Sequence, residues 1–184
     1  QAGQIDGLVW RVTLSPDGRP LVYDSMHPCG CYHMFFPVRG VTARSASADA
    51  PGEWAFSPRA APTLASGERL VLRVAAETHY LEGLDVRSAH TPTGKDTTHR
   101  WRDYDALRSL ALPDGRSRSV FDTQGFMPGT DRLESWLFWP MGIARAGAMR
   151  QWGRHATAFV GRRHFDDARL IEQRFDVGAA LAGE

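Results

Sequence analysis

An alternating segment near the start of the chain constrains the fold more than any other feature. In GLVWRVTL (7–14) the larger apolar side chains share one side of an extended chain, namely Leu8, Trp10, Val12 and Leu14. This two-residue period is typical of a half-buried strand. The following SPDGRP supplies an Asp17-Gly18 turn, and LVYDS (21–25) resumes the extended pattern. The segment therefore predicts a β-hairpin and an antiparallel sheet built around it.

Three further segments complete the expected organisation around this hairpin. RLVLRVAAETHYLEGLDV (69–86) alternates over a long stretch and predicts a second β segment. Residues 39–69 are rich in Ala, Ser and Pro, which indicates a loop, interrupted by a short strand near 54–57. The dense apolar run SWLFWPMGI (135–143) predicts a core segment packed on both sides.

Two short helices complete the predicted architecture. The first lies near 103–112 with Asp103 as its cap, and the second lies near 166–175, after the carboxylates of DDARLIEQRF. We expect Leu170, Ile171 and Phe175 to face inward. The chain is thus expected to be a mainly β single domain over 1–184, antiparallel and sandwich- or barrel-like, with one or two short peripheral helices.

Composition restricts the classes of partner. The formal net charge of +1 gives no overall attraction to nucleic acid or anionic lipid. No apolar run approaches the roughly 18 residues that a membrane-spanning helix needs. Lys95 is the only lysine and asparagine is absent, which suggests a GC-rich bacterial genome rather than selection for arginine chemistry. The start at Gln1 and the β-rich, turn-rich pattern favour a periplasmic or secreted protein.

The candidate functional residues lie in HPCGCYH, which contains both cysteines of the chain. His27, Cys29, Cys31 and His33 occupy every second position, so they share one side of an extended chain. A straight strand would hold the two histidines roughly 20 Å apart, too far to meet one ion. Pro28 and Gly30 are suited to bending the segment, because glycine readily adopts positive φ.

A bent segment predicts a transition-metal site. His79, in the second β segment, is the expected additional ligand, and Glu77 two residues before it is the candidate general base if the ion is catalytic. Thiolate and imidazole ligands favour Zn²⁺, with copper second. His90 and His99 are weaker candidates, and His155 and His164 are weaker still. The metal would be carried, sensed or used in catalysis, and the sequence leaves open whether the protein is an enzyme.

The sequence leaves two other interpretations of the same cysteines open. A Cys29–Cys31 disulfide would close a very short loop, and its strain would make it redox-labile. Alternatively, both cysteines are free and buried and carry no chemistry. With either the redox-labile disulfide or inert cysteines, the chain would be a non-enzymatic module that binds a small molecule, a protein or a carbohydrate, with Trp54, Trp101 and Trp152 as candidate sugar-binding residues.

Several common sites have no signature in this sequence. Covalent c-type haem requires Cys-x-x-Cys-His, which is missing. Glycine-rich phosphate loops and nucleophile elbows are missing as well, so no nucleotide cofactor is expected.

Overall fold

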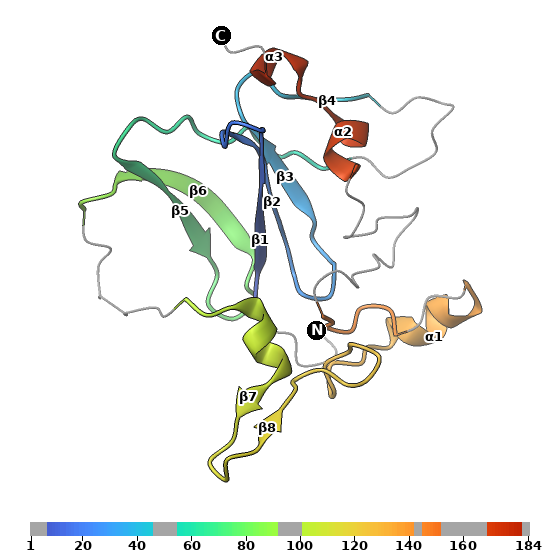
Figure 1. Ribbon diagram of the computed structural model, residues 1–184. Helices are drawn as coiled ribbons and strands as arrows, with labels where there is room; N and C mark the ends of the chain where they lie inside the picture. Colours follow the sequence, from blue (N-terminus) through green and yellow to red (C-terminus); the bar gives the residue numbers. More distant parts are fainter. Residues whose placement is uncertain (1–6, 46–54, 92–100, 142–144, 152–168, 182–184) are drawn as a thin grey trace.

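A three-stranded antiparallel sheet forms the centre of the molecule (Figure 1). It consists of β1 (Val9–Leu14), β2 (Pro20–Met26) and β3 (Met34–Pro37), with β2 in the middle. The computed structural model describes residues 7–45, 55–91, 101–141, 145–151 and 169–181. Within these residues the fold is mainly β and antiparallel, as predicted.

The hairpin predicted at the start of the chain is confirmed. β1 pairs with β2 from Val9↔Met26 to Leu14↔Pro20, and the turn is closed by a hydrogen bond from Ser15 N to Arg19 O of 2.8 Å. Gly18 adopts φ 85° in this turn. The apolar face of β1 is only partly covered, because β1 lies at the edge of the sheet: Val12 and Leu14 are exposed.

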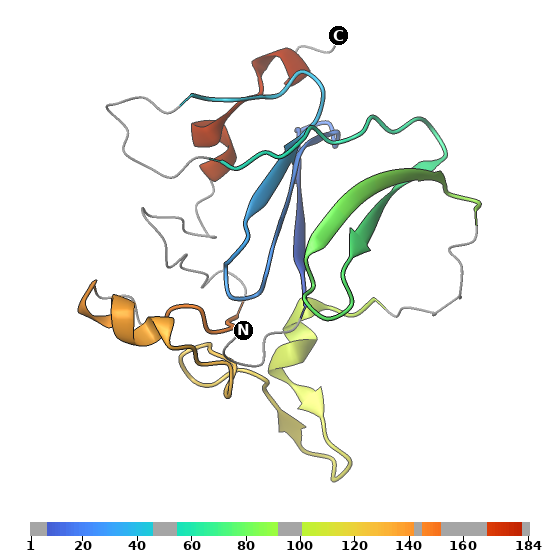
Figure 2. The ribbon, with the colours of Figure 1, turned by 180° about the vertical axis from the view of Figure 1, so that it is seen from behind.

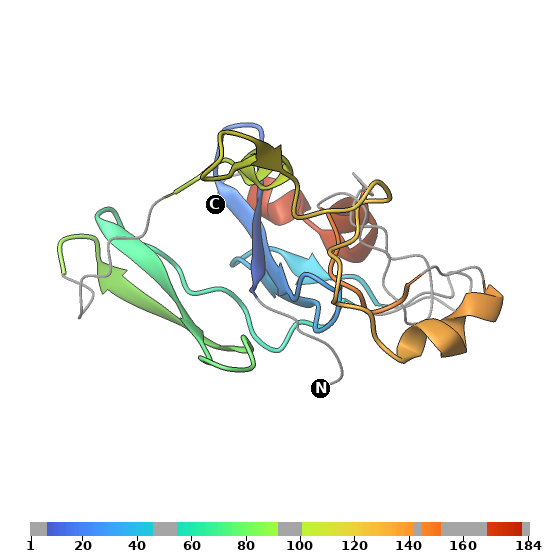
Figure 3. The same ribbon diagram turned by 90° about the horizontal axis from the view of Figure 1, so that it is seen from below.

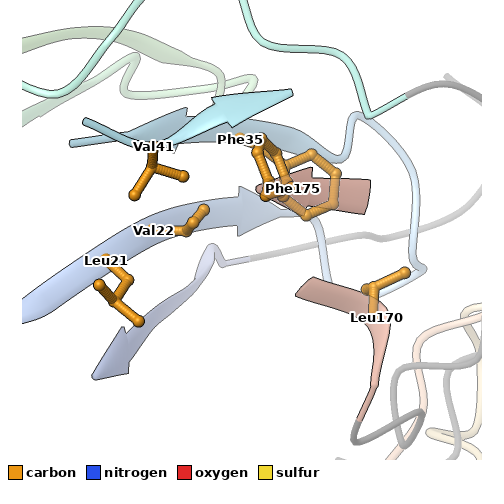
Figure 4. Close-up of a cluster of buried hydrophobic side chains, with 6 residues drawn as sticks. All are labelled: Leu21, Val22, Phe35, Val41, Leu170 and Phe175. Atoms are coloured by element: carbon orange, nitrogen blue, oxygen red, sulfur yellow. The ribbon is translucent and has the colours of Figure 1, made fainter. Parts of the chain in front are cut away.

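Two hydrophobic clusters cover the two faces of β2, whose consecutive side chains point in opposite directions. Val22 and Phe35 belong to the first cluster, where the ring of Phe35 lies 5.5 Å from that of Phe175 (Figure 4). Tyr23 and Phe36 belong to the second cluster, against which Trp10 and several leucines pack. β2 is thus buried on both faces, which gives the molecule a sandwich-like core.

The β segment predicted over 69–86 is a hairpin of two strands rather than one continuous strand. β5 (Glu68–Val74) pairs with β6 (Leu81–Ser88), and residues 75–80 form the turn between them. The hairpin packs against one side of the central sheet (Figure 2). Its contacts with the second cluster are made by Leu70, Leu72 and Leu84. His79 lies in the turn at φ 55°, so it does not share a strand face with Glu77 as predicted.

Both helices predicted at the periphery are present and short. Asp103 caps the 3₁₀ helix η1 (Tyr104–Arg108) by accepting a hydrogen bond from Asp105 N, and the chain then becomes extended at β7 (Leu110–Ala111). Helix α2 (Leu170–Arg174) buries Leu170, and Phe175 starts strand β9 (Phe175–Asp176) with its side chain in the core. Residues 166–168 of this prediction lie outside the described residues.

The prediction of a core segment over 135–143 is wrong for the residues that are described. They form helix α1 (Glu134–Phe138) and the 3₁₀ helix η2 (Trp139–Met141), and α1 projects from the side of the molecule (Figure 3). Trp136 is 82% exposed and Trp139 is 75% exposed. Apolar composition alone does not specify a packing partner, and among the described residues these two rings have none in the core clusters.

The remaining elements are small. β4 (Thr42–Ala43) pairs with β9, β7 pairs with β8 (Ser117–Arg118), and helix α3 (Gly178–Leu181) follows β9. The strand predicted near 54–57 is not formed at residues 55–57, although Phe56 O accepts a hydrogen bond from Phe35 N of 2.9 Å. The four sheets of the described residues do not close into a barrel. No helix among them is long and apolar enough to span a membrane.

A buried carboxylate ties the three central strands together. Asp24 on β2 is 1% exposed and accepts hydrogen bonds from Arg11 Nε of 2.9 and 3.1 Å. His33, next to the start of β3, places its Nε2 atom 3.0 Å from the same carboxylate. A charge that is out of water requires such partners, so the network fixes how the strands pack.

Asp24→Ala is expected to lower the free energy of unfolding by about 3–5 kcal/mol, because it leaves the Arg11 charge without its carboxylate. Chemical denaturation measures this loss. Asp85→Ala is the matched control, since Asp85 is a half-exposed partner of Arg73 at 3.7 Å and its removal should have little effect. Equal losses in the two variants would contradict a structural role for the network.

Candidate functional site

The loop between β2 and β3 contains both cysteines and folds into a tight turn. Gly30 N donates to His27 O at 2.8 Å, and His27 N donates to Cys31 O at 3.0 Å. Gly30 has φ 86°, a conformation that costs other residues roughly 1–2 kcal/mol. The bend predicted at Gly30 is therefore confirmed, and it lies at the lower end of the central sheet in Figure 1.

The turn brings the two cysteines close together. Both cysteines are free, with Cys29 buried and Cys31 partly exposed. Cys31 N donates to Cys29 Sγ at 3.4 Å, which holds the two side chains close together. The Cys31 hydrogen bond lowers the pKa of Cys29 to about 7. The same hydrogen bond and burial raise the pKa of Cys31, so the pair readily carries one negative charge but not two.

Arg132 brings a positive charge to the thiols from a distant part of the chain. Its Nη1 atom lies 3.9 Å from Cys31 Sγ, and its Nη2 atom is paired with Glu134. The stem of Arg132 passes close to Gly147, where a Cβ atom would lie 3.0 Å from Arg132 Cδ. The absence of a side chain at Gly147 therefore leaves the space that Arg132 occupies beside Cys31.

Arg150 is a second, more deeply buried guanidinium near the pair. It is 4% exposed and donates hydrogen bonds to the backbone oxygens of Arg145 at 3.0 Å and Ala148 at 3.3 Å. Burial lowers the pKa of Arg150, whereas the negative charge of Cys29 and Cys31 opposes that shift. Because the attraction is mutual, Arg150 favours a thiolate in the pair.

Aromatic rings enclose the other side of the turn. His27 stacks on Tyr80 with ring centroids 5.3 Å apart, and Tyr32 lies 5.0 Å from the same imidazole. Burial lowers the pKa of His27, opposed by a hydrogen bond to the His79 backbone. Buried Nε2 of His27 has no hydrogen-bond partner among the described residues. Tyr32 and His79 both have positive φ, 56° and 55°, which is uncommon for residues with a side chain.

The predicted ligands are only partly brought together. Cys29 and Cys31 are in contact, and His27 lies beside the backbone of His79. His33 is directed to Asp24 in the core, and Glu77 is exposed in the β5–β6 turn. Within the described ranges no three His, Cys, Asp or Glu side chains are arranged to hold a metal ion.

The weaker candidates add little to this site. His90 is exposed just after β6, and His99, His155 and His164 lie outside the described residues. Of the aromatic residues considered for carbohydrate, Trp101 is 97% exposed, while Trp54 and Trp152 lie outside the described residues.

The two arginines beside the thiols were not predicted. They follow Cys31 by about a hundred positions, in DRLES and AMRQW, where no local motif distinguishes them from the many other arginines of the chain. Only tertiary packing selects them.

Comparison with models of known protein families gives no match for this chain, and comparisons with curated proteins and with solved structures give none either.

Gly30→Ala tests whether the turn sets the chemistry of the thiols. The substitution should cost roughly 1–2 kcal/mol of stability and raise the pH at which the thiols become reactive, because the turn that holds Cys31 beside Cys29 is disturbed. Alkylation by iodoacetamide across a pH series measures this. Gly18→Ala is the control, since Gly18 has φ 85° and nothing within 4 Å of a Cβ atom. An unchanged pH profile in folded Gly30→Ala would refute the role of the turn.

Proposed function

We propose that Cys29 and Cys31 form a redox-active dithiol that alternates between two thiols and one disulfide. The observation that carries this proposal is the tight turn at Gly30, in which Cys31 N donates to Cys29 Sγ at 3.4 Å. Because the turn holds both cysteines at the same place, the two sulfur atoms need little further movement to form a bond. The chemistry also requires a thiolate, which the lowered pKa of Cys29 and the nearby guanidiniums favour.

The partly exposed thiol is the one that meets a partner. Cys31 attacks one sulfur of a partner disulfide as a thiolate, its proton having moved to Cys29, and the second partner sulfur leaves as a thiolate. Arg132 is placed to stabilise the Cys31 thiolate. Cys29 then releases its proton, attacks Cys31 Sγ and expels the first partner sulfur. Two electrons have passed to the partner, whose two thiolates take up the proton from Cys29 and one proton from solvent, and a Cys29–Cys31 disulfide remains.

The short spacing between the cysteines affects how easily their disulfide is reduced. A disulfide between residues two apart is strained, and a strained disulfide is reduced easily. The oxidised pair would therefore act as an oxidant of other thiols more readily than as a structural staple. This role fits the predicted periplasmic or secreted location, where disulfides form and persist.

A second candidate function uses the same thiols to bind one soft transition-metal ion, with Zn²⁺ favoured over copper. The observation in its favour is the buried Nε2 atom of His27, which lacks a hydrogen-bond partner among the described residues. Cys29, Cys31 and His27 would hold the ion, and His33 and His79 would have to turn to join them. Bound zinc would supply Lewis-acid chemistry, with Glu77 as the proposed base. The charges of Arg132 and Arg150 oppose a divalent cation, which places this function second.

Intact-mass measurement with a free-thiol count separates the two functions. After treatment with diamide, a thiol oxidant, the dithiol should lose two hydrogens and both free thiols without cross-linking to a second chain, and reduction should restore both. Cys29→Ser and Cys31→Ser should each block this change. Two thiols that persist under oxidising conditions would refute the redox proposal.

Elemental analysis of the reduced protein, repeated on the double Cys29→Ser/Cys31→Ser variant, tests the metal. One equivalent of zinc or copper that disappears in the double variant would support metal binding. Metal-free reduced protein that also fails to take up added Zn²⁺ would refute it.

A further inference from the structure

A pocket lies at the opposite end of β2 from the dithiol. Its volume is about 520 Å³, within the range of roughly 300–1,000 Å³ that is usual for small-molecule sites. The turn between β1 and β2, the residues after β3 and helix α3 surround it, and these segments lie together at the top of Figure 1.

The inner wall of the pocket is apolar and well supported. Pro20, Leu21 and Val38 line it, and Leu21 also belongs to the first hydrophobic cluster. Ala180 of α3 closes one side. It approaches Gly40 so closely that a Cβ atom there would lie 3.6 Å from Ala180 Cα. The wall thus rests on the core of the protein, which gives the pocket a defined shape.

Among the described residues, the charged side chains that line the pocket and their ion-pair partners leave a surplus of one positive charge. Arg19 and Arg39 both line it. Arg19 is paired with Asp17 at 2.6 Å, and the pairing helps to lower the pKa of that carboxyl. Arg39 has no ion-pair partner among the described residues. A guanidinium without a carboxylate partner, above an apolar wall, is suited to a ligand that is anionic at one end and apolar at the other.

We propose that this pocket binds a small organic carboxylate with an aliphatic chain, its head group on Arg39 and its chain on the wall formed by Pro20, Leu21 and Val38. The single surplus charge matches a monoanion better than a dianion such as a phosphate monoester. The proposal is independent of the dithiol, since the two sites share no residue.

Isothermal titration of the full chain with octanoate, and with octanamide as the uncharged counterpart, tests the proposal. Octanoate should bind at one site and more tightly than octanamide. Arg39→Ala should weaken octanoate binding about tenfold or more and leave octanamide unchanged, because only the charged head group is affected. Arg59→Ala is the control, an exposed arginine that does not line the pocket.

A second variant tests the apolar wall without disturbing the core. Thr63 is exposed and lines the pocket, so Thr63→Trp should fill the space and abolish binding of both ligands in a protein that still folds. Absence of octanoate binding to the wild-type chain, or equal binding to the wild type, Arg39→Ala and Thr63→Trp, would overturn the proposal.

Discussion

The hydrogen-bonded turn from His27 to Cys31 is the constraint on which the chemistry of this protein depends. Without the positive φ of Gly30 the chain would continue as a strand, and side chains two residues apart would be held apart by the pleat. With it, the two cysteines lie close together at the end of the central sheet. Cys29 faces the protein interior while Cys31 remains within reach of solvent, so the two thiols have different roles from the outset.

Residues from distant parts of the chain surround the turn. The central sheet holds its two ends, since β2 leads into it and β3 leads out, and the Asp24 network locks these strands together. The β5–β6 hairpin supplies Tyr80 and the His79 backbone on one side. Arg132 and Arg150 supply positive charge from sequence positions far beyond the sheet. Together these groups stabilise one negative charge in a site that is largely out of water.

Sequence patterns predicted the parts of the fold that depend on local signals. The β1–β2 hairpin has both alternation and an Asp-Gly turn, and it was predicted correctly. The β5–β6 hairpin was predicted as one strand because its turn, AAETHY, contains neither Gly nor Pro; His79 takes the positive φ instead. The run around Trp136 was assigned to the core because apolarity indicates a need for burial and not whether a partner is available.

The candidate site divides in the same way. The spacing of Cys29 and Cys31 can be read directly from the sequence. The bend at Gly30 was predicted, because glycine conformation is a local property. The direction of His33 was not, since it depends on the Asp24 carboxylate of the neighbouring strand, and sequence spacing does not show which hydrogen-bond partner a side chain finds. The arginines beside the thiols were not predicted either, because tertiary packing decides which arginines lie there and no sequence pattern shows it.

The most direct test of this account is the ionisation of the reduced thiols, followed by thiolate absorbance near 240 nm as a function of pH. We expect one thiolate to form with a pKa of about 7 and no second thiolate until far higher pH. The step near pH 7 should disappear in Cys29→Ser. Two thiols that ionise together near the ordinary value of 9.0 would contradict this expectation, because Cys31 would then not lower the pKa of Cys29.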